Sequence, residues 1–364
     1  MLNTVANSAS RIRTVTGSTH SEIDGSVSPT DLLSAWIGHT AVGASGAGVT
    51  ALDITALGSL SAGKVELIIT DQGAGVHHAG SIFATVGDFS IAGNGDLHIA
   101  GGHIKAANDV IVASASLDSA ADGSGSSIQA GRTVDIRSQR ISFADTSVAA
   151  GTRGIDANGN VFVSQRGNVL IGSDGVAGTA AITAERSQLD ATGGIAIYNQ
   201  GQDLQLASTQ LGADQDLIIK ANNLTFMSSP TGTPVSSMTS RTGTVTANLS
   251  GTMTLAGATV DGMAGVSINS AELSSTNGMQ AGASIKGLIR SQAGDIGITT
   301  VGATSLSATD LLAARNVVLQ NAGFSANNVG QQGSSVVASA GGLLIDSGGD
   351  LINIGSLQED DESL

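Results

Sequence analysis

A short motif recurs along the 364-residue chain, and its regular form limits the folds that the chain can adopt. The motif reads apolar, any, small, then three residues that usually end in Asp, Asn or Gly, then apolar, any, apolar. Such self-similar segments predict a repeat architecture in which the copies stack on one another. The full copies are Ile91-Gly93-Leu97-Ile99, Ile104-Ala106-Val110-Val112, Ile128-Ala130-Val134-Ile136, Ile155-Ala157-Val161-Val163, Leu189-Ala191-Ile195-Ile197, Leu211-Ala213-Leu217-Ile219, Val260-Gly262-Val266-Ile268, Leu311-Ala313-Val317-Leu319 and Val337-Ser339-Leu343-Ile345, and a weaker copy is Leu273-Ser275-Met279-Ala281.

The two halves of the motif predict two short strands joined by a tight turn. Strand side chains alternate between faces, so the final apolar, any, apolar triplet places two apolar side chains on one face. The residue before that triplet is a turn former in almost every copy, for example Asp109, Asp216 and Asn316. Such residues accept left-handed backbone angles, and Asn and Asp also hydrogen-bond to nearby backbone.

The spacing between copies predicts the length of one coil. Leu189 and Leu211 are 22 positions apart, which falls within the repeat range of β-solenoids. Ile104 and Ile128 are 24 positions apart, but Ile91 precedes Ile104 by only 13. We explain the shorter step by a coil of three strands that uses the same motif at two of its corners.

The composition favours a narrow apolar core over disorder. Hydrophobic residues make up 41% of the chain and charged residues 12%, whereas a disordered chain combines low hydrophobicity with high charge. Aromatic residues make up only 2%, and there are 50 glycines. Small side chains suit a thin β-solenoid in which each layer holds only a few of them. The predicted fold class is therefore all-β, a single-stranded parallel β-helix.

The charge balance excludes two classes of partner. The formal net charge is −15, and nucleic acids and anionic membrane surfaces both need concentrated Lys and Arg. No stretch approaches the roughly 18 uninterrupted apolar residues of a membrane-spanning helix, and no signal peptide is visible at the start. The absence of cysteine excludes disulfides and thiolate metal sites. We expect no nucleic-acid partner and no membrane insertion.

The N-terminal segment, 1–45, is predicted to close the end of the β-helix with a short helix. Ser28 is a good N-cap, and Pro29 suits the first helical position. The apolar residues that follow share one helical face, and Gly38 is a stop signal, so the capping helix is predicted over 28–38. Such a cap would cover backbone groups that an open coil leaves unpaired.

The rest of the chain is predicted to form one β-helix over 46–357. The motif lapses near 227–244, where Ser, Thr and Pro are frequent, and an irregular loop is expected there. The acidic tail, 358–364, carries four consecutive acidic residues and is predicted to be disordered, because like charges repel one another.

Histidines raise the question of a metal site, since His77, His78, His98 and His103 lie close together in the sequence. Adjacent strand residues point to opposite faces, so His77 and His78 cannot easily share one ion. No carboxylate or Cys cluster with ligand spacing accompanies them, and one Asp per copy cannot complete a calcium shell. We expect no metal and no cofactor, and solvent-facing or loop positions for these histidines.

An enzyme is disfavoured, and no catalytic residue is predicted. β-Helical enzymes that degrade polysaccharides need clustered Asp or Glu for acid and base work, usually with aromatic platforms for the sugar. The chain has 1 Trp, 1 Tyr and 6 Phe, so such platforms are scarce. Carboxylates from neighbouring coils could still meet, so a polysaccharide-degrading enzyme is kept as an alternative.

A candidate interaction stripe comes from the middle residues of the apolar triplets, which should face outward but are themselves apolar in several copies. If they align, they form an exposed apolar line of the kind that marks an interaction surface, including lateral self-association. The competing interpretation is that loops or terminal segments cover them. The stripe consists of Ile111, Phe162, Leu170, Ile218, Val318 and Leu344.

Several copies resemble the haemagglutinin repeats of the filamentous haemagglutinin family, large exoproteins of Gram-negative bacteria. The likeness is clearest in Asn158-Gly159-Asn160-Val161-Phe162-Val163, in Gly95-Asp96-Leu97-His98-Ile99 and in the segment from Ala213 to Ile219, and it covers roughly residues 80–355. The resemblance implies a right-handed parallel β-helix that is secreted or held at the cell surface. It also implies passage through an outer-membrane two-partner transporter and an adhesive or toxin-delivery role.

The resemblance implies a receptor on a host or bacterial surface. The first 80 residues lack the Asn-Pro-rich signature of the family's secretion domain, so the chain is expected to be a fragment of a longer adhesin. An autotransporter passenger domain is a further alternative, because such passengers are also β-helical.

Overall fold

All regular secondary structure in the described residues of the computed structural model is β-strand, and these residues contain no helix that could cross a membrane. The chain divides into two units, Met1–Gly172 and Ser173–Leu364, which are described separately. The structure describes residues 3–5, 10–17, 19–28, 31, 34, 37–41, 45–119, 125–230, 233–330, 332–354 and 357–360.

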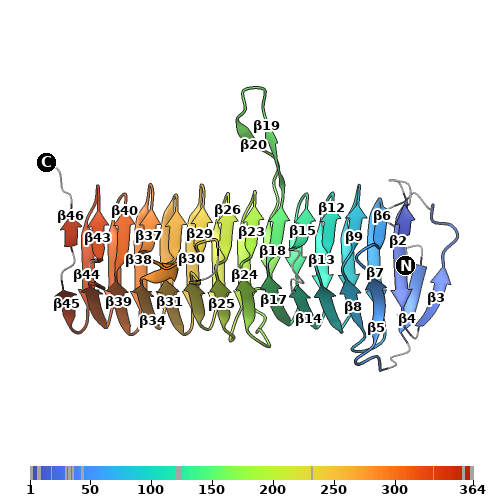
Figure 1. Ribbon diagram of the computed structural model, residues 1–364, viewed down its shortest axis with the longest axis horizontal. Helices are drawn as coiled ribbons and strands as arrows, with labels where there is room; N and C mark the ends of the chain where they lie inside the picture. Colours follow the sequence, from blue (N-terminus) through green and yellow to red (C-terminus); the bar gives the residue numbers. More distant parts are fainter. Residues whose placement is uncertain are drawn as a thin grey trace. The chain divides into compact units, whose positions relative to one another are not determined.

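The first unit is a β-solenoid in which successive strands visit three parallel sheets in turn (Figure 1). Its first sheet contains β1 (Asn3–Val5), β6 (Ser59–Ala62), β9 (Ser81–Ala84), β12 (His103–Ala106), β15 (Ser126–Ala130) and β18 (Thr146–Ala150). Its second sheet contains β2 (Arg11–Thr16), β7 (Lys64–Ile69), β10 (Phe89–Ala92), β13 (Val110–Ala113), β16 (Val134–Ile136) and β21 (Val169–Ile171). Its third sheet contains β5 (Thr50–Ile54), β8 (Gly75–His78), β11 (Asp96–Ile99), β14 (Ser116–Ser119) and β17 (Arg140–Ala144).

The second unit repeats the same three-sheet coil. Its first sheet contains β23 (Gln188–Ala191), β26 (Gln210–Ala213), β29 (Ser237–Ser240), β32 (Thr259–Gly262), β37 (Gly287–Ser291), β40 (Thr309–Ala313), β43 (Ser335–Ala338) and β46 (Leu357–Asp360). Its second sheet contains β24 (Ile195–Asn199), β27 (Leu217–Ala221), β30 (Thr244–Leu249), β33 (Gly265–Ser270), β38 (Asp295–Thr300), β41 (Val317–Asn321) and β44 (Leu343–Ser347). Its third sheet contains β22 (Ile182–Glu185), β25 (Leu204–Ala207), β28 (Leu224–Met227), β31 (Thr252–Ala256), β34 (Glu272–Thr276), β39 (Ala303–Ser307), β42 (Gly323–Asn327) and β45 (Leu351–Ile354).

In the part of the chain that the structure describes, three antiparallel hairpins interrupt the coils. Each is a local insertion, because its two strands pair with each other and join none of the three sheets. The first unit holds β3 (Thr19–Ile23) with β4 (Ile37–Ala41) and β19 (Thr152–Ile155) with β20 (Val161–Gln165), and the second holds β35 (Gly278–Gln280) with β36 (Ala283–Ile285).

Apolar side chains stack in ladders inside each unit, as the motif predicts. In the first unit, parallel pairing places Ile104 between Ile82 and Ile128, and all three are buried. In the second unit, Leu211 pairs in the same way with Leu189 and Met238. Burial of each such side chain contributes about 1.5–3 kcal/mol, so the ladders are the main source of stability.

Most motif copies lie at the corner between the first and second sheets. The copy that begins at Ile91 instead spans β10 and β11, at the corner between the second and third sheets, while the copy at Ile104 spans β12 and β13. A coil therefore uses the motif at two corners, which confirms our explanation of the 13-residue step from Ile91 to Ile104.

The Asp and Asn residues at the corners act through hydrogen bonds between coils and not through left-handed backbone. Asp109, Asp216 and Asn316 are absent from the residues with positive φ, so that part of the turn prediction is wrong. Instead, Oδ1 of Asp109 accepts a hydrogen bond from the amide of Thr133 at 3.0 Å, one coil later. Oδ1 of Asp216 likewise accepts from the amide of Thr244 at 2.8 Å. These side chains satisfy corner amides that would otherwise lack a partner.

One predicted copy is not a coil at all. Ile155-Ala157-Val161-Val163 lies in the antiparallel hairpin of β19 and β20, where Ile155 pairs with Val161. The turn explains the reversal, because Oδ1 of Asp156 accepts hydrogen bonds from the amides of Asn158 and Asn160, both at 2.8 Å. Gly159, with φ of 83°, completes it. The prediction of a stacked copy here is wrong, since a local Asp-closed turn replaces the corner.

Two other copies are shifted or interrupted. In the last copy the inward residue is Val336, which pairs with Leu311, and not the predicted Val337. The weaker copy starts correctly at Leu273, which is buried in β34, but Met279 lies in the β35–β36 hairpin. Both errors arise because the length of the corner varies while the motif assumes a fixed spacing.

The predicted capping helix over 28–38 falls mostly outside the described residues. Ile37 and Gly38, at its predicted end, lie in strand β4, where Gly38 pairs with Glu22 of β3. Pairing with β3 satisfies their backbone groups, so the helix does not extend to these two positions. The N-terminal segment also contributes to the coils directly, because β2 pairs in parallel with β7.

The predicted loop and tail are both smaller than expected. Strand β29 lies within the segment 227–244 and pairs with β26, so the described residues without regular structure before it are only 228–230 and 233–236. In the tail, residues 358–360 belong to β46, which pairs with β43, and residues 361–364 lie outside the described part. Backbone pairing to an existing sheet edge outweighs the unfavourable local sequence at both places.

The ladders can be tested by truncating one inward side chain. We expect Ile104→Ala to lower the free energy of unfolding by roughly 2–5 kcal/mol, because it removes buried methyl groups between Ile82 and Ile128. Lys105→Ala is the matched control, since Lys105 is the next residue of β12 and faces solvent. Chemical denaturation of the two variants measures the difference, and equal losses would contradict the inward ladder.

Candidate functional site

The structure separates the residues of the predicted stripe. In the first unit, Ile111 and Leu170 lie on the outer face of the second sheet, but Asp135 stands between them in the pairing. Phe162 lies on the β19–β20 hairpin and is not in line with them. The prediction that these positions align is therefore wrong for Phe162, because its copy forms a hairpin.

The stripe residues of the second unit share one outward column but are spread along it. Ile218 pairs with Thr246, and the column then passes through a serine and a glycine before it reaches Val318. Val318 pairs directly with Leu344, which is 53% exposed. Only this last pair forms neighbouring apolar positions, and whether it serves as an interaction surface stays a prediction.

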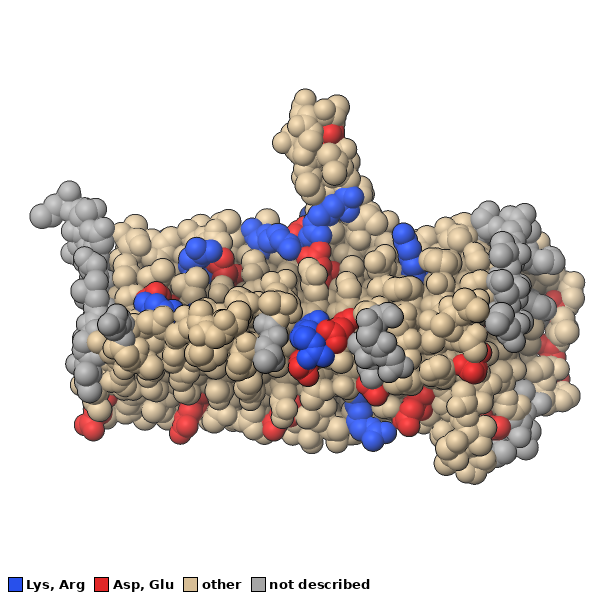
Figure 2. Space-filling model, viewed as in Figure 1, with Lys and Arg blue, Asp and Glu red and all other residues tan. Residues whose placement is uncertain are grey.

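The β19–β20 hairpin carries an apolar surface that the sequence did not reveal. It projects away from the stacked strands of its own unit, and most of its surface is uncharged (Figures 1 and 2). Ile155 and Val161 are 73% and 64% exposed, and Phe162 is also exposed. Two-stranded hairpins gain little stability alone, so apolar residues kept on both of its strands are typical of a contact surface.

A column of titratable side chains runs along the outer face of the third sheet in the first unit. Parallel pairing aligns Asp53, His77, His98 and Asp118 on four successive strands. The imidazole rings of His77 and His98 stack with centroids 5.6 Å apart and planes inclined by 19°. Val76 and Leu97 are 21 positions apart and pair directly, which brings His77 and His98 side by side with the same spacing.

Each ring of this column faces a carboxylate at the end away from the other ring. Nδ1 of His77 lies 2.7 Å from Oδ1 of Asp53, and Nδ1 of His98 lies 3.6 Å from Oδ2 of Asp118. A carboxylate that accepts from Nδ1 favours the tautomer in which Nε2 is left as an acceptor. The hydrogen bond to Asp53 therefore fixes the orientation of the His77 ring, whereas Asp118 lies near His98 without a hydrogen bond.

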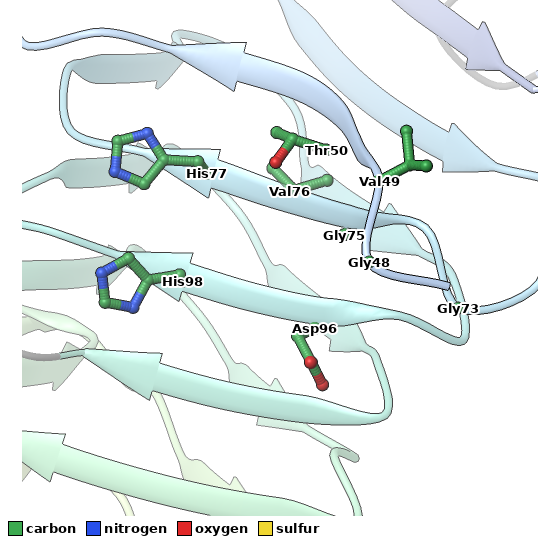
Figure 3. A pocket seen from close by; sticks show the side chains of 9 residues that line it. All are labelled: Gly48, Val49, Thr50, Gly73, Gly75, Val76, His77, Asp96 and His98. Carbon is green, nitrogen blue, oxygen red and sulfur yellow. The ribbon is translucent and has the colours of Figure 1, made fainter. Parts of the chain in front are cut away.

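A hollow of about 340 Å³ opens beside the histidine pair. Figure 3 shows that it lies between the chain around Gly48 and the strands that carry His77 and His98, with Asp96 at its margin. It exists because Gly75 provides no side chain between Thr50 and Asp96, its two neighbours in the sheet. A Cβ at Gly75 would lie only 2.8 Å from the carbonyl oxygen of Asp96, so the close strand packing also requires glycine there.

Asp96 is held at the margin of the hollow by two neighbours on its own column. The hydroxyl of Ser116 donates to Oδ1 of Asp96 at 2.5 Å, and Nη2 of Arg140 donates to the same oxygen at 3.3 Å. Both neighbours lie on the side away from Gly75, so Oδ2 of Asp96 is left to face other groups. The hollow is thus bordered by hydrogen-bond acceptors whose positions the sheet fixes.

His78 faces the opposite way from His77, as the alternation of strand side chains predicts. It lies in β8 and is only 1% exposed, so the expectation of a solvent-facing or loop position is wrong for His78. Its Nε2 lies 3.3 Å from the carbonyl oxygen of His103. Gly102 makes room for the ring, because a Cβ there would lie 2.7 Å from Cδ2 of His78. Desolvation of the charged form lowers the pKa of His78 to about 4.

Comparison with known proteins gives one similarity. Over 62 residues the chain is 44% identical to Toxin CdiA of Yersinia pestis. The matched stretch is 17% of this chain and 2% of that protein, so the chain spans a small part of its relative. No protein family matches the chain, and no solved structure matches it. The similarity and the β-solenoid are consistent with a repeat region of the filamentous haemagglutinin type.

No group of three or more metal-ligating side chains is found among the residues that the structure describes. His77 and His78 point to opposite faces of β8, which is the orientation that their adjacent positions predict.

The buried histidine predicts a loss of stability in weak acid. The folded-state pKa of about 4 lies below the ordinary value of 6.5, so the unfolded chain binds a proton first as the pH falls. This contribution is complete above pH 6.5 and is lost between pH 6.5 and 4. Between pH 7 and 5 we expect the free energy of unfolding to drop by about 2 kcal/mol through this group.

His78→Leu should remove that drop, as measured by denaturation at a series of pH values. The exposed His20 provides the control, since His20→Gln should leave the drop unchanged. An identical pH profile for wild type and His78→Leu would show that another group is responsible.

Proposed function

We propose that the chain is a non-catalytic β-solenoid scaffold of a secreted or cell-surface adhesin, a fragment of a haemagglutinin-type exoprotein exported by an outer-membrane two-partner transporter. The main support is the regular parallel pairing of coil on coil within both units. The local similarity to Toxin CdiA adds to it. The expected partner is a receptor on a host or bacterial surface.

The coil architecture suits the display of binding surfaces. Each coil contacts only its neighbours, so a turn can be lengthened without disturbing the rest of the structure. The β19–β20 hairpin is such an insertion. Ile155 and Val161 pair across its two strands on one face, and Phe162 lies over Gly154 on the other, so a partner can cover exposed apolar side chains on either face. We infer that the hairpin is the main contact element of the first unit.

A structural use of many carboxylates supports the non-catalytic part of the proposal. Nη1 and Nη2 of Arg241 bind Asp214 and Asp190, at 2.8 and 2.9 Å, and so join successive coils. Arg290 binds Asp261 through a bidentate pair, with Nη2 2.6 Å from Oδ2. Carboxylates engaged in this way are poorly placed to donate or accept protons from a substrate.

The hairpin can be tested with purified protein and cultured cells. We expect the triple variant Ile155→Ser, Val161→Ser, Phe162→Ser to bind cells at least about fivefold more weakly than wild type, because it removes the exposed apolar surface. Val301→Ser is the matched control, since Val301 is a single apolar residue that is also strongly exposed. Flow cytometry of labelled protein measures binding on epithelial cells and on Gram-negative bacteria.

Both variants replace exposed side chains, so their melting temperatures should match that of wild type. If wild type binds neither type of cell, the adhesive role is contradicted. If the triple variant binds as well as wild type, contact is made elsewhere, and the hairpin loses its assigned role.

Catalysis is tested separately. Incubation of the purified chain with acidic and neutral polysaccharides should release no new reducing ends or unsaturated products. Release of either product would favour the alternative of a β-helical polysaccharide-degrading enzyme and would contradict the scaffold proposal.

A further inference from the structure

The residues that border the hollow beside His77 and His98 determine what it can bind. We infer that it takes a cationic nitrogen group, a primary ammonium or a guanidinium, together with the alkyl chain that carries it. This inference does not depend on how the protein is exported. Its basis is the set of acceptors, the local charge and the shape of the hollow.

Acceptors dominate the border. Asp96 lines one side of the hollow, with its carboxylate turned toward Ser116 of the next strand, and the rings of His77 and His98 lie at the other side (Figure 3). Because Nδ1 of His77 donates to Asp53 at 2.7 Å, Nε2 of His77 is left as an acceptor. A ligand that only donates hydrogen bonds matches such a border, and ammonium and guanidinium groups are donors without acceptor atoms.

Charge favours the same ligand. Asp53, Asp96 and Asp118 all lie on the outer face of this sheet, and Arg140 is the basic side chain bonded among them. Nη2 of Arg140 already donates to Oδ1 of Asp96 at 3.3 Å, which shows that a guanidinium group can approach this carboxylate. A second cationic group can approach from the side of Gly75, where no side chain intervenes. An anion would meet a net negative charge there.

The shape favours a cation on an alkyl stem. The volume of about 340 Å³ exceeds what a single ammonium or guanidinium head occupies. Val49 lines the hollow and is exposed, so it offers apolar contact to methylene groups behind the head. Butyl or propyl stems of the kind found in small amines and basic side chains fit this arrangement.

Other ligand classes fit less well. Among the side chains that line the hollow there is no Trp, Tyr or Phe to stack on a sugar ring. A sugar hydroxyl also needs donors as well as acceptors, and the side chains at this border are mainly acceptors. A metal ion is disfavoured, because the described residues bring together no set of three ligating groups.

Calorimetric titration of the whole chain tests the inference with three probes. The probes are agmatine, a blocked Gly-Arg-Gly peptide, and the same peptide with citrulline in place of arginine, which has nearly the same shape without the charge. We expect saturable binding of agmatine or the arginine peptide and no binding of the citrulline peptide. Binding of agmatine alone would identify a small free amine as the source, and binding of both would allow a basic protein side chain.

Asp96→Asn should weaken binding roughly fivefold or more, because it removes the charge that the cation approaches. Asp135→Asn is the matched control, since Asp135 also faces outward and is bound by Arg137 on the second sheet. Equal binding of the citrulline and arginine peptides, or equal affinity of wild type and Asp96→Asn, would overturn the inference. Failure of all probes to bind would also overturn it.

The histidine rings provide a second readout. Their nitrogen resonances should shift on addition of agmatine in wild type, and the resonances of His20 should not, because His20 lies on the β3–β4 hairpin. A shift of His20 alone would place the amine elsewhere and contradict the assignment.

Discussion

In-register parallel pairing is the interaction on which the rest of the structure depends. When each strand pairs with the strand one coil later, side chains of the same kind are brought into columns, both inside and outside. The inward columns, such as Ile82, Ile104 and Ile128, form the core, and the outward columns decide what the surface can bind. A one-residue slip would exchange the two faces, so the ladder of backbone hydrogen bonds and the apolar pattern fix each other.

The inward ladders could be predicted from the sequence because the motif records them directly. An apolar residue two positions before a small one fits a narrow corner, and this pattern located Leu189, Leu211 and Val260 correctly. The hairpin at Ile155 could not be separated from a coil in this way, because its residues satisfy the motif equally well. The segment from Asp156 to Gly159 distinguishes it. There the Asp156 side chain accepts a hydrogen bond from the amide of Asn158, and Gly159 adopts a positive φ, so that the chain turns back between two paired strands.

The outward columns were harder to predict, because they depend on the number of residues in each coil. His77 and His98 meet only because one coil at that place is 21 residues long, whereas the spacing of the motif gives coils of 22 or 24 residues elsewhere. The predicted apolar stripe is interrupted for the same reason. The coil lengths place Asp135 between Ile111 and Leu170. To predict which side chains meet on the surface of a solenoid, the exact length of each coil must be known. The core can be predicted without it, because variation at the corners leaves the inward pattern unchanged.

The corner carboxylates give the stack a direction. In each case the acceptor belongs to the earlier coil and the amide to the later one, as with Asp109 and Thr133, Asp216 and Thr244, or Asp295 and Asn316. A coil thus presents carboxylate acceptors at its corners to the segment that follows it. Within each unit, a coil that pairs with the carboxyl-terminal side of the stack therefore meets acceptors that the previous coil already holds in place.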